Sequence, residues 1–428
     1  MRRLIIPLIL FISLSGGPDQ CKAEVRSFSD TLRLKPADAE KLFLEQNLSL
    51  LAERCNVDAA RAMIIQARLY SNPNLTIEQG VYDPDSKKLF DVEYTGNTGF
   101  TLQQLFYLAG KRDKRIRIEQ LNTERQEDLF YDLLRSLRYQ LKNDFNTLYF
   151  KQQTLKVFDK ELAPLNKLVE VYKEQNKKGF VSDKELARLQ ASQFSLENER
   201  LSLSNEITDL DVDLGILLHR PGCFIMPELN EKSTTPAEMT AFPLQALIDT
   251  AMQNRADLKA AEHNVKWNEA NLAFQKSLAI PDFTLQADYS RQGSYVRDYN
   301  AITLGIDLPF FNKNQGNIKA AKFQADNSKY MLQLAEDNVK GDVIQAYNRM
   351  LQNENLYKSF DLPFYRNFDK LLEEVTLNFE KKNISLLEFL DFYEAYKDNQ
   401  VQLNTFLNNR LDTFEELNFS VGKNIISY

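Results

Sequence analysis

Glycine and proline are scarce in this sequence, which has 14 glycines and 13 prolines in 428 residues, about half of their usual combined share. Few of the residues that end helices are therefore present, which favours long uninterrupted helices. Three cysteines are too few for a disulfide framework. There are only two histidines and no HExxH, phosphate-loop or nucleophile-elbow motif. We therefore expect no enzyme, no catalytic residue, no bound metal and no cofactor.

The sequence also lacks an excess of positive charge. Its formal net charge is −7, and both signs are interspersed along the chain. A nucleic-acid-binding surface needs clustered lysine and arginine, so we expect no nucleic-acid partner. Beyond residue 30 there is no run of 18 apolar residues, so we expect no transmembrane helix.

An export signal is predicted at residues 1–23. The letters MRR precede the apolar stretch Leu4–Leu14, which is too short to span a bilayer as a helix. Cleavage after Ala23 or nearer Gly17 fits this pattern, and whether Cys21 carries a lipid stays open. The chain is then expected in the periplasm, secreted, or in the outer membrane through β-strands.

The chain contains an internal duplication. Residues 50–80 laid over residues 258–288 give seven identities in 31 positions, and Pro73 and Pro281 precede an alternating stretch in both copies. Chance similarity between amphipathic helices is the alternative. Each half is predicted as helix, two strands and two long helices. The expected organisation is a repeat at 34–220 (β-hairpin near 75–106, helical hairpin 113–217), an equatorial linker at 221–242, a second repeat at 243–421 (β-hairpin near 283–308, helical hairpin 317–418) and a C-terminal tail at 422–428.

The predicted helices are longer than a compact domain needs. Ten positions from Leu186 to Leu217 follow 3-4 spacing, and only Gln193 and Arg200 among them are not Leu or Ile. This is a heptad seam, so an antiparallel coiled hairpin is predicted around a turn at 176–183. A continuous helix over 113–176 would be about 96 Å long. Pro164 and Pro363 are the points where the two long helices are expected to kink.

Four short stretches alternate between apolar and polar residues, which indicates strands near 75–82, 90–106, 283–289 and 302–308. Because the helices have their own seams, few segments remain to cover the apolar faces. With an export signal, lipid is one surrounding for those faces, and two hairpins on a soluble rod is the other. The residues predicted to face lipid are Leu75, Ile77, Phe283, Leu285, Ile302, Leu304 and Ile306.

These features together resemble the TolC-like outer-membrane efflux proteins, over nearly the whole chain from 34 to about 421. Two corners carry the more specific likeness. The letters QQLFYLAGKR at 103–112 and LPFFNKNQGNI at 308–318 are similar to the strand-to-helix corners of the heavy-metal, CzcC/CusC-like branch.

The resemblance implies a mixed, mainly α fold and a homotrimer. Its three subunits would form a 12-stranded transmembrane β-barrel continued by an α-helical barrel into the periplasm. The implied function is a passive outer-membrane channel for metal cations or drugs. It would dock a periplasmic adaptor and an inner-membrane pump, of the RND type. A type I secretion channel of the same fold and a periplasmic coiled-coil tether or adaptor are the alternatives.

The resemblance also implies two sites at the open end of the helical hairpins. Glu388 and Asp391 stand where family members carry constriction carboxylates, and threefold symmetry would place six of them around one axis. Two acids on a solvated helix face is the alternative. The turns predicted to contact an adaptor are Lys178, Gly179, Val181 and Ser182 in the first half and Lys382, Asn383, Ile384 and Ser385 in the second.

Overall fold

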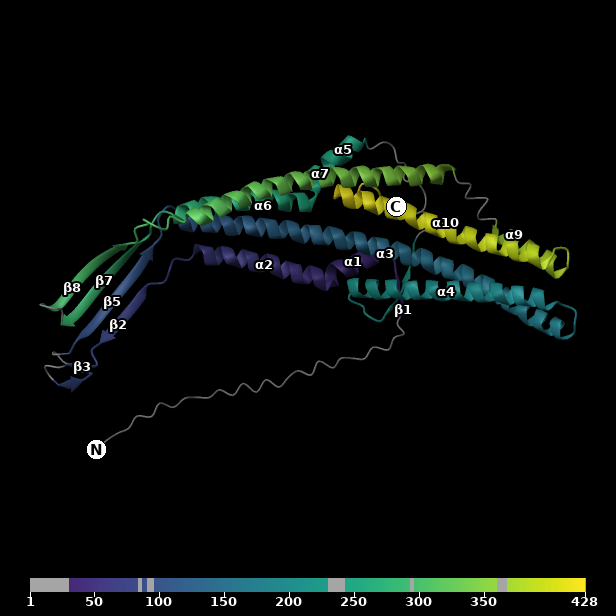
Figure 1. The fold of residues 1–428 in the computed structure, drawn as a ribbon, viewed down its shortest axis with the longest axis horizontal. Coiled ribbons are helices and arrows are strands. Elements are labelled where there is room, and N and C mark those ends of the chain that lie inside the picture. The colour runs from purple at the N-terminus through teal and green to yellow at the C-terminus, as the bar shows by residue number, and fades with distance from the viewer. Residues whose placement is uncertain are drawn as a thin grey trace, which may run out of the picture.

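The fold was obtained as a computed structural model, which describes residues 31–83, 87–90, 96–229, 243–292, 296–359 and 368–427. The predicted export signal with Cys21, most of the equatorial linker and Pro363 lie outside these residues. The molecule is elongated (Figure 1): a β-sheet lies at one end and the helical hairpins reach to the other. The fold is mainly helical, as the composition predicts.

The order of elements is nearly the same in the two halves. The first half contains β1 (Thr31–Leu34), α1 (Pro36–Gln46), α2 (Leu48–Arg68), β2 (Asn74–Gln79), β3 (Tyr82–Asp83), β4 (Lys88–Leu89), β5 (Thr98–Phe106), α3 (Lys111–Lys177) and α4 (Asp183–Leu217). The second contains β6 (Phe224–Pro227), α5 (Leu244–Asn254), α6 (Ala256–Leu278), β7 (Phe283–Gln292), β8 (Arg297–Ile306), α7 (Gln315–Ser359), α9 (Phe368–Glu380) and α10 (Leu386–Val421). Both β2 and β7 begin within two residues of the repeated prolines, Pro73 and Pro281.

The main sheet is antiparallel and has the strand order β2-β5-β7-β8. Each half supplies one hairpin, and the hairpins meet where β5 pairs with β7, from Gly99 with Ser290 to Phe106 with Phe283. Strands β2 and β8 are the two edges within the described chain. Each edge therefore presents backbone groups that a further strand could pair with.

The helices form a row (Figure 1): α3 runs alongside α2 and α4, and α7 runs alongside α6 and part of α10. Helices α2 and α4 both contact α3, and α6 and α10 lie between α3 and α7. The helix α3 runs through Pro164 as one helical segment of 67 residues. Proline costs a helix one hydrogen bond, and packing against α4 and α10 on both sides holds the helix together here.

The predicted heptad seam is buried in the helical hairpin. Leu189, Leu196, Leu203, Ile207 and Leu214 are all buried. The two polar exceptions reach across to α3: Gln193 donates to Asn166 at 2.6 Å, and Arg200 pairs with Asp159 at 2.6 Å. A polar residue in a seam fixes the register of a coiled coil, which explains why these two positions are not leucine.

Two short strand pairs form outside the main sheet. Within the predicted linker, β6 pairs in parallel with β1, Thr31 opposite Phe224. Ile225 is fully buried in that pair. Burial of this apolar side chain favours a strand although the residues around it are typical of loops. Between β2 and β5, the short strands β3 and β4 extend the first hairpin, with Asp83 opposite Lys88.

Among the described residues, no helix combines the length and the apolar character needed to cross a bilayer. Cys55 and Cys223 are both free thiols.

Candidate functional sites at the two ends of the molecule

The register of the main sheet sorts its side chains into an apolar and a polar face. Residues that pair across an antiparallel sheet point to the same side. Leu75 pairs with Leu102, which pairs with Ala287, which pairs with Ile302. By the same register, all seven residues predicted to face lipid lie on one face: Leu75, Ile77, Phe283, Leu285, Ile302, Leu304 and Ile306.

The apolar face is uncovered in the single chain. Ile302 is 81% exposed, and Ile77 and Leu304 are exposed as well. Phe283 is half-buried and stacks on Phe106 at 5.0 Å between ring centres. A contiguous apolar surface of this kind marks a contact with lipid or with another protein.

The opposite face carries a hydrogen-bonded polar network centred on Asp288. Thr101 donates to Asp288 at 2.8 Å, and Gln286 donates to the same carboxylate at 2.7 Å. Thr76 pairs with Thr101 and so lies on this face too. Side chains that bind water line this surface, so the two faces suit two different solvents.

A lysine ties the two halves together where the sheet meets the helices. Lys111, in the corner that the sequence singled out, forms an ion pair with Asp282 at 2.7 Å and donates to the carbonyl of Ile280 at 2.6 Å. Asp282 also accepts from the backbone of Leu108 at 2.8 Å. Lys111 is only 6% exposed. It therefore holds the α6-to-β7 transition against the start of α3.

Neighbouring corner residues fix the other transitions. Arg112 donates to the carbonyl of Arg68 at 2.8 Å and stacks on Tyr70 at 4.4 Å, which fixes the α2-to-β2 transition. Asn314, in the second corner, has a left-handed backbone and donates to the carbonyl of Gln275 at 2.8 Å. The corner residues that resemble a known family thus bind the ends of neighbouring helices. The sequence alone did not reveal these contacts.

The two turns at the far end of the helical hairpins have the same hydrogen-bond pattern. Phe180 donates its backbone N–H to Gln175, and Asn383 donates to Asn378. The left-handed residue is Gly179 in the first turn and Lys382 in the second. Lys382 therefore takes the place of the first turn's glycine, next to Asn383.

Both second helices of the hairpins begin with a capping box. Ser385 accepts from the backbone of Glu388 at 3.3 Å, and Glu388 accepts from the backbone N–H of Ser385 at 2.8 Å. Ser182 and Glu185 repeat this arrangement in the first hairpin. The signal S-x-x-E was present in both turns of the sequence, and it identifies a structural role for Glu388 that the constriction hypothesis omitted.

Glu388 and Asp391 are both exposed near the start of α10. The backbone and hydroxyl hydrogen bonds from Ser385 lower the pKa of Glu388, so this carboxyl is negative at neutral pH. Exposure and charge are compatible with the constriction hypothesis, which stays a prediction.

The two tips enclose a cleft of about 550 Å³ between the hairpins. Val181 and Ile384 line it from the two turns, and Phe389 lines it from α10. Phe180, which also lines the cleft, is 80% exposed. Of the eight residues predicted to contact an adaptor, Val181 and Ile384 are half-buried and the other six are exposed: Lys178, Gly179, Ser182, Lys382, Asn383 and Ser385.

A two-faced sheet continued by long helical hairpins is the arrangement of the TolC-like fold. The model of the family described as "Outer membrane efflux protein" matches residues 247–360. The cobalt-zinc-cadmium resistance protein CzcC of Cupriavidus metallidurans is 20% identical over 401 residues, which are 91% of this chain and 92% of that protein. The chain is thus similar to the outer membrane efflux proteins, by the family match over residues 247–360 and by the likeness to CzcC.

Solved structures share the fold along nearly the whole chain. CusC superposes with a TM-score of 0.70 at 15% identity, covering 91% of this chain and 92% of that chain. The Campylobacter jejuni CmeC outer membrane channel superposes with a TM-score of 0.70 at 14% identity, covering 92% and 87% of the two chains. The TolC-like fold expected from the sequence is confirmed.

Proposed function

We propose that this protein is the outer-membrane channel of a tripartite efflux system, a passive duct that extends from the outer membrane into the periplasm. The observation that carries this function is the two-faced sheet. Seven predicted lipid-facing residues share one exposed apolar face, while Asp288 and its partners occupy the other. An apolar outer surface and a polar lumen are what a channel in a membrane requires.

The sheet argues against a periplasmic tether. A tether would expose Ile302 and Leu304 to water, and so large a contiguous apolar surface is rare on soluble monomers. A channel places the same face in lipid.

A homotrimer is proposed as the working form. The main sheet has four described strands, whereas about eight strands are needed to close a sheet into a barrel. Strand β8 of one copy can pair with β2 of the next, because both are edge strands. The TolC-like resemblance implies three copies, and hence a closed sheet of twelve strands.

Partners in the periplasm and inner membrane are proposed from the tips and the family. The sequence has no phosphate-binding loop, so the energy for export must come from another component. The exposed turns at Gly179 and Lys382 are the surfaces proposed to contact a periplasmic adaptor, and the pump is proposed to be of the RND type. Metal cations are the proposed substrates, supported by the likeness to CzcC.

Purification from outer-membrane fractions tests the channel. We expect a heat-modifiable trimer on denaturing gels and defined single-channel conductance in planar bilayers. A strain without the gene should become more sensitive to cobalt, zinc or cadmium. A monomeric protein recovered in the soluble periplasm would contradict the function, and increased drug sensitivity alone would contradict only the substrate.

A further inference from the structure

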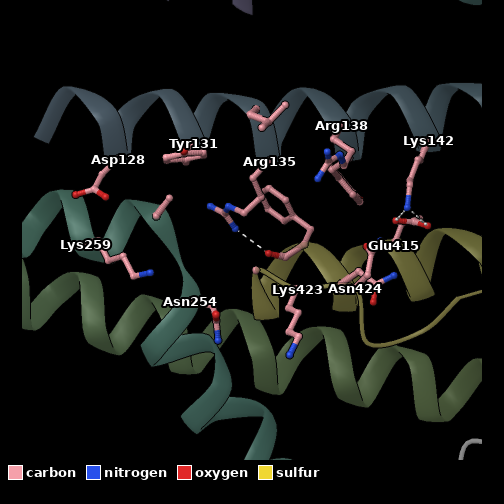
Figure 2. Close-up of a pocket in the computed structure, with 16 residues that line it drawn as sticks. Asp128, Tyr131, Arg135, Arg138, Lys142, Asn254, Lys259, Glu415, Lys423 and Asn424 are labelled. Carbon is pink, nitrogen blue, oxygen red and sulfur yellow. Dashed lines mark hydrogen bonds and ion pairs between the residues drawn. The ribbon is translucent and has the colours of Figure 1, made fainter. Parts of the chain in front are cut away.

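A cavity of about 510 Å³ lies near the middle of the molecule, away from both ends. It is bounded by α3, by the start of α6, by the end of α10 and by the C-terminal tail (Figure 2). Five cationic side chains line it, against two carboxylates, Asp128 and Glu415. The cations are Arg135, Arg138, Lys142, Lys259 and Lys423. This local excess of positive charge contrasts with the net charge of −7 for the whole chain.

Three of the cations have carboxylate partners that fix them in the cavity wall. Arg135 pairs with Asp132 at 2.6 Å and donates to the carbonyl of Phe419 at 2.8 Å. Its guanidinium also lies 4.1 Å from the Phe419 ring centre. Lys142 pairs with Glu415 at 3.1 Å. The Arg135–Phe419 hydrogen bond and the Lys142–Glu415 ion pair, which Figure 2 shows, hold α10 against α3.

The third pair, Arg138 with Glu40 at 2.8 Å, joins α3 to α1. Asp128 lies 2.5 Å from Nδ1 of His263. Both carboxylates of the lining are thus engaged, Asp128 with His263 and Glu415 with Lys142.

Lys259 and Lys423 are different, because neither has a carboxylate partner within the described part of the chain. Lys259 extends from α6 and Lys423 from the tail, so the two ammonium groups come from different walls (Figure 2). Two uncompensated cations around one cavity attract an anion, and a charged hydrogen bond is stronger than a neutral one.

We propose that this cavity binds an anionic small molecule through carboxylate or phosphate groups held by Lys259 and Lys423. Tyr131 and Asn424, which can both form hydrogen bonds, also line the space. Its volume falls within the range of small-molecule sites, and it exceeds what a single inorganic ion fills.

The cavity is formed within a single chain. It is lined by α3, α6 and α10, which occupy the middle of the row of helices. In the proposed trimer, a neighbouring copy that pairs edge to edge would contact the outer helices of the row. The site therefore belongs to each subunit by itself and goes beyond the channel function, since binding here does not require an open duct.

Equilibrium dialysis of the purified full-length protein tests the site. The probes are radiolabelled citrate and radiolabelled inorganic phosphate, each at constant ionic strength set with chloride. We expect saturable binding of about one citrate or phosphate per chain, and the tighter probe identifies the chemical group. K259A/K423A should weaken binding by at least about tenfold, the loss expected for two charged hydrogen bonds.

A matched control is K319A/K322A, which removes two exposed lysines of α7 that do not line the cavity. This variant should bind like the parent. Equal loss in both double variants, or no saturable binding of either probe to the parent, would overturn the proposal. K259Q alone, with an intermediate loss, serves if the double variant assembles poorly. Unchanged single-channel conductance in K259A/K423A separates this site from the duct.

Discussion

The side-chain amide of Asn47 donates a hydrogen bond to the backbone carbonyl of Leu217, 2.9 Å away and 170 positions further along the chain. The oxygen of the same side chain accepts from the backbone of Leu50 at 3.0 Å. One residue therefore caps the start of α2 and satisfies a carbonyl at the end of α4. Asn47 joins two separate helices into one column beside α3.

The second half makes the equivalent junction with different chemistry. Arg255 lies 208 positions after Asn47, at the offset of the internal duplication, and precedes α6. Its guanidinium pairs with Asp342 at 2.7 Å and contacts the carbonyl of Ser420 at 3.4 Å. Duplication kept the position of the junction and changed the side chain that makes it.

Replacing Asn47 with alanine should lower the free energy of unfolding by about 2 kcal/mol, because a helix cap is lost and a buried carbonyl loses its partner. Urea unfolding followed by circular dichroism measures this. Asn56→Ala in the same helix is the control, since this exposed side chain donates to Glu53 one turn earlier in the same helix. Equal destabilisation by both substitutions would contradict the junction role.

Lys111→Met should destabilise the chain by about 3 kcal/mol, because it leaves the Asp282 carboxylate without its cationic partner. The yield of assembled, heat-modifiable protein is the readout. The double variant K111M/D282N should recover much of the loss, since no unpaired charge remains. Lys322→Met, on the exposed surface, is the control. A double variant no better than K111M would show that the ion pair is not the cause.

Glu161 predicts a pH dependence of the helical hairpin. Its side chain is fully buried, and its two carboxyl oxygens have no hydrogen-bond partner within the described chain. Burial raises its pKa from 4.5 to about 8. Lys397 and Lys160 act in the opposite direction, and Glu199 and Asp398 add to the rise. The folded state therefore holds the proton more tightly than the unfolded state.

The stability that this proton provides is complete below pH 4.5 and is lost as the pH rises toward 8. Glu161→Gln should stabilise the protein at pH 8 by about 2 kcal/mol or more relative to the parent, and flatten the decline between pH 5 and 8. Unfolding measured across this range checks it, with exposed Glu262→Gln as the control. A parent whose stability rises with pH over this window would refute the assignment to Glu161.

The two faces of β2 should respond oppositely to charge. Ile77→Lys places an ammonium group on the proposed lipid face and should cost about 2–4 kcal/mol near the middle of the bilayer. Thr76→Lys, one residue away on the polar face, should be tolerated. The amount of trimer in outer-membrane fractions compares them. Similar assembly of both variants would mean that this strand never enters a membrane.

The constriction hypothesis is tested by E388Q/D391N. Glutamine keeps the capping bond to Ser385, so the helix start is preserved while the charge is removed. We expect lower cation selectivity or altered single-channel conductance in planar bilayers. Glu185→Gln is the matched control, because Glu185 has the same capping role in the first hairpin. Selectivity that matches the parent in E388Q/D391N would leave both acids as parts of a solvated helix face.

The periodic parts of this fold could be predicted from the sequence. The heptad seam from Leu189 to Leu214 is buried as its spacing required, and the alternation after Pro73 and Pro281 became strands. Such patterns depend on which side of one element is apolar, and that information is local. The short strand β6 was missed, because its pairing with β1 depends on a segment nearly 200 positions earlier.

By itself, then, the sequence determined the elements, their order and the two faces of each strand, because side-chain periodicity acts within a single helix or strand. Only the tertiary structure decided that β5 lies beside β7, that Asn47 meets Leu217, that Lys111 reaches Asp282 and that Lys259 and Lys423 border one cavity. Each of these contacts joins positions that are far apart along the chain. Side chains of this kind find their partners only after the helices and strands have packed, and no local pattern encodes that.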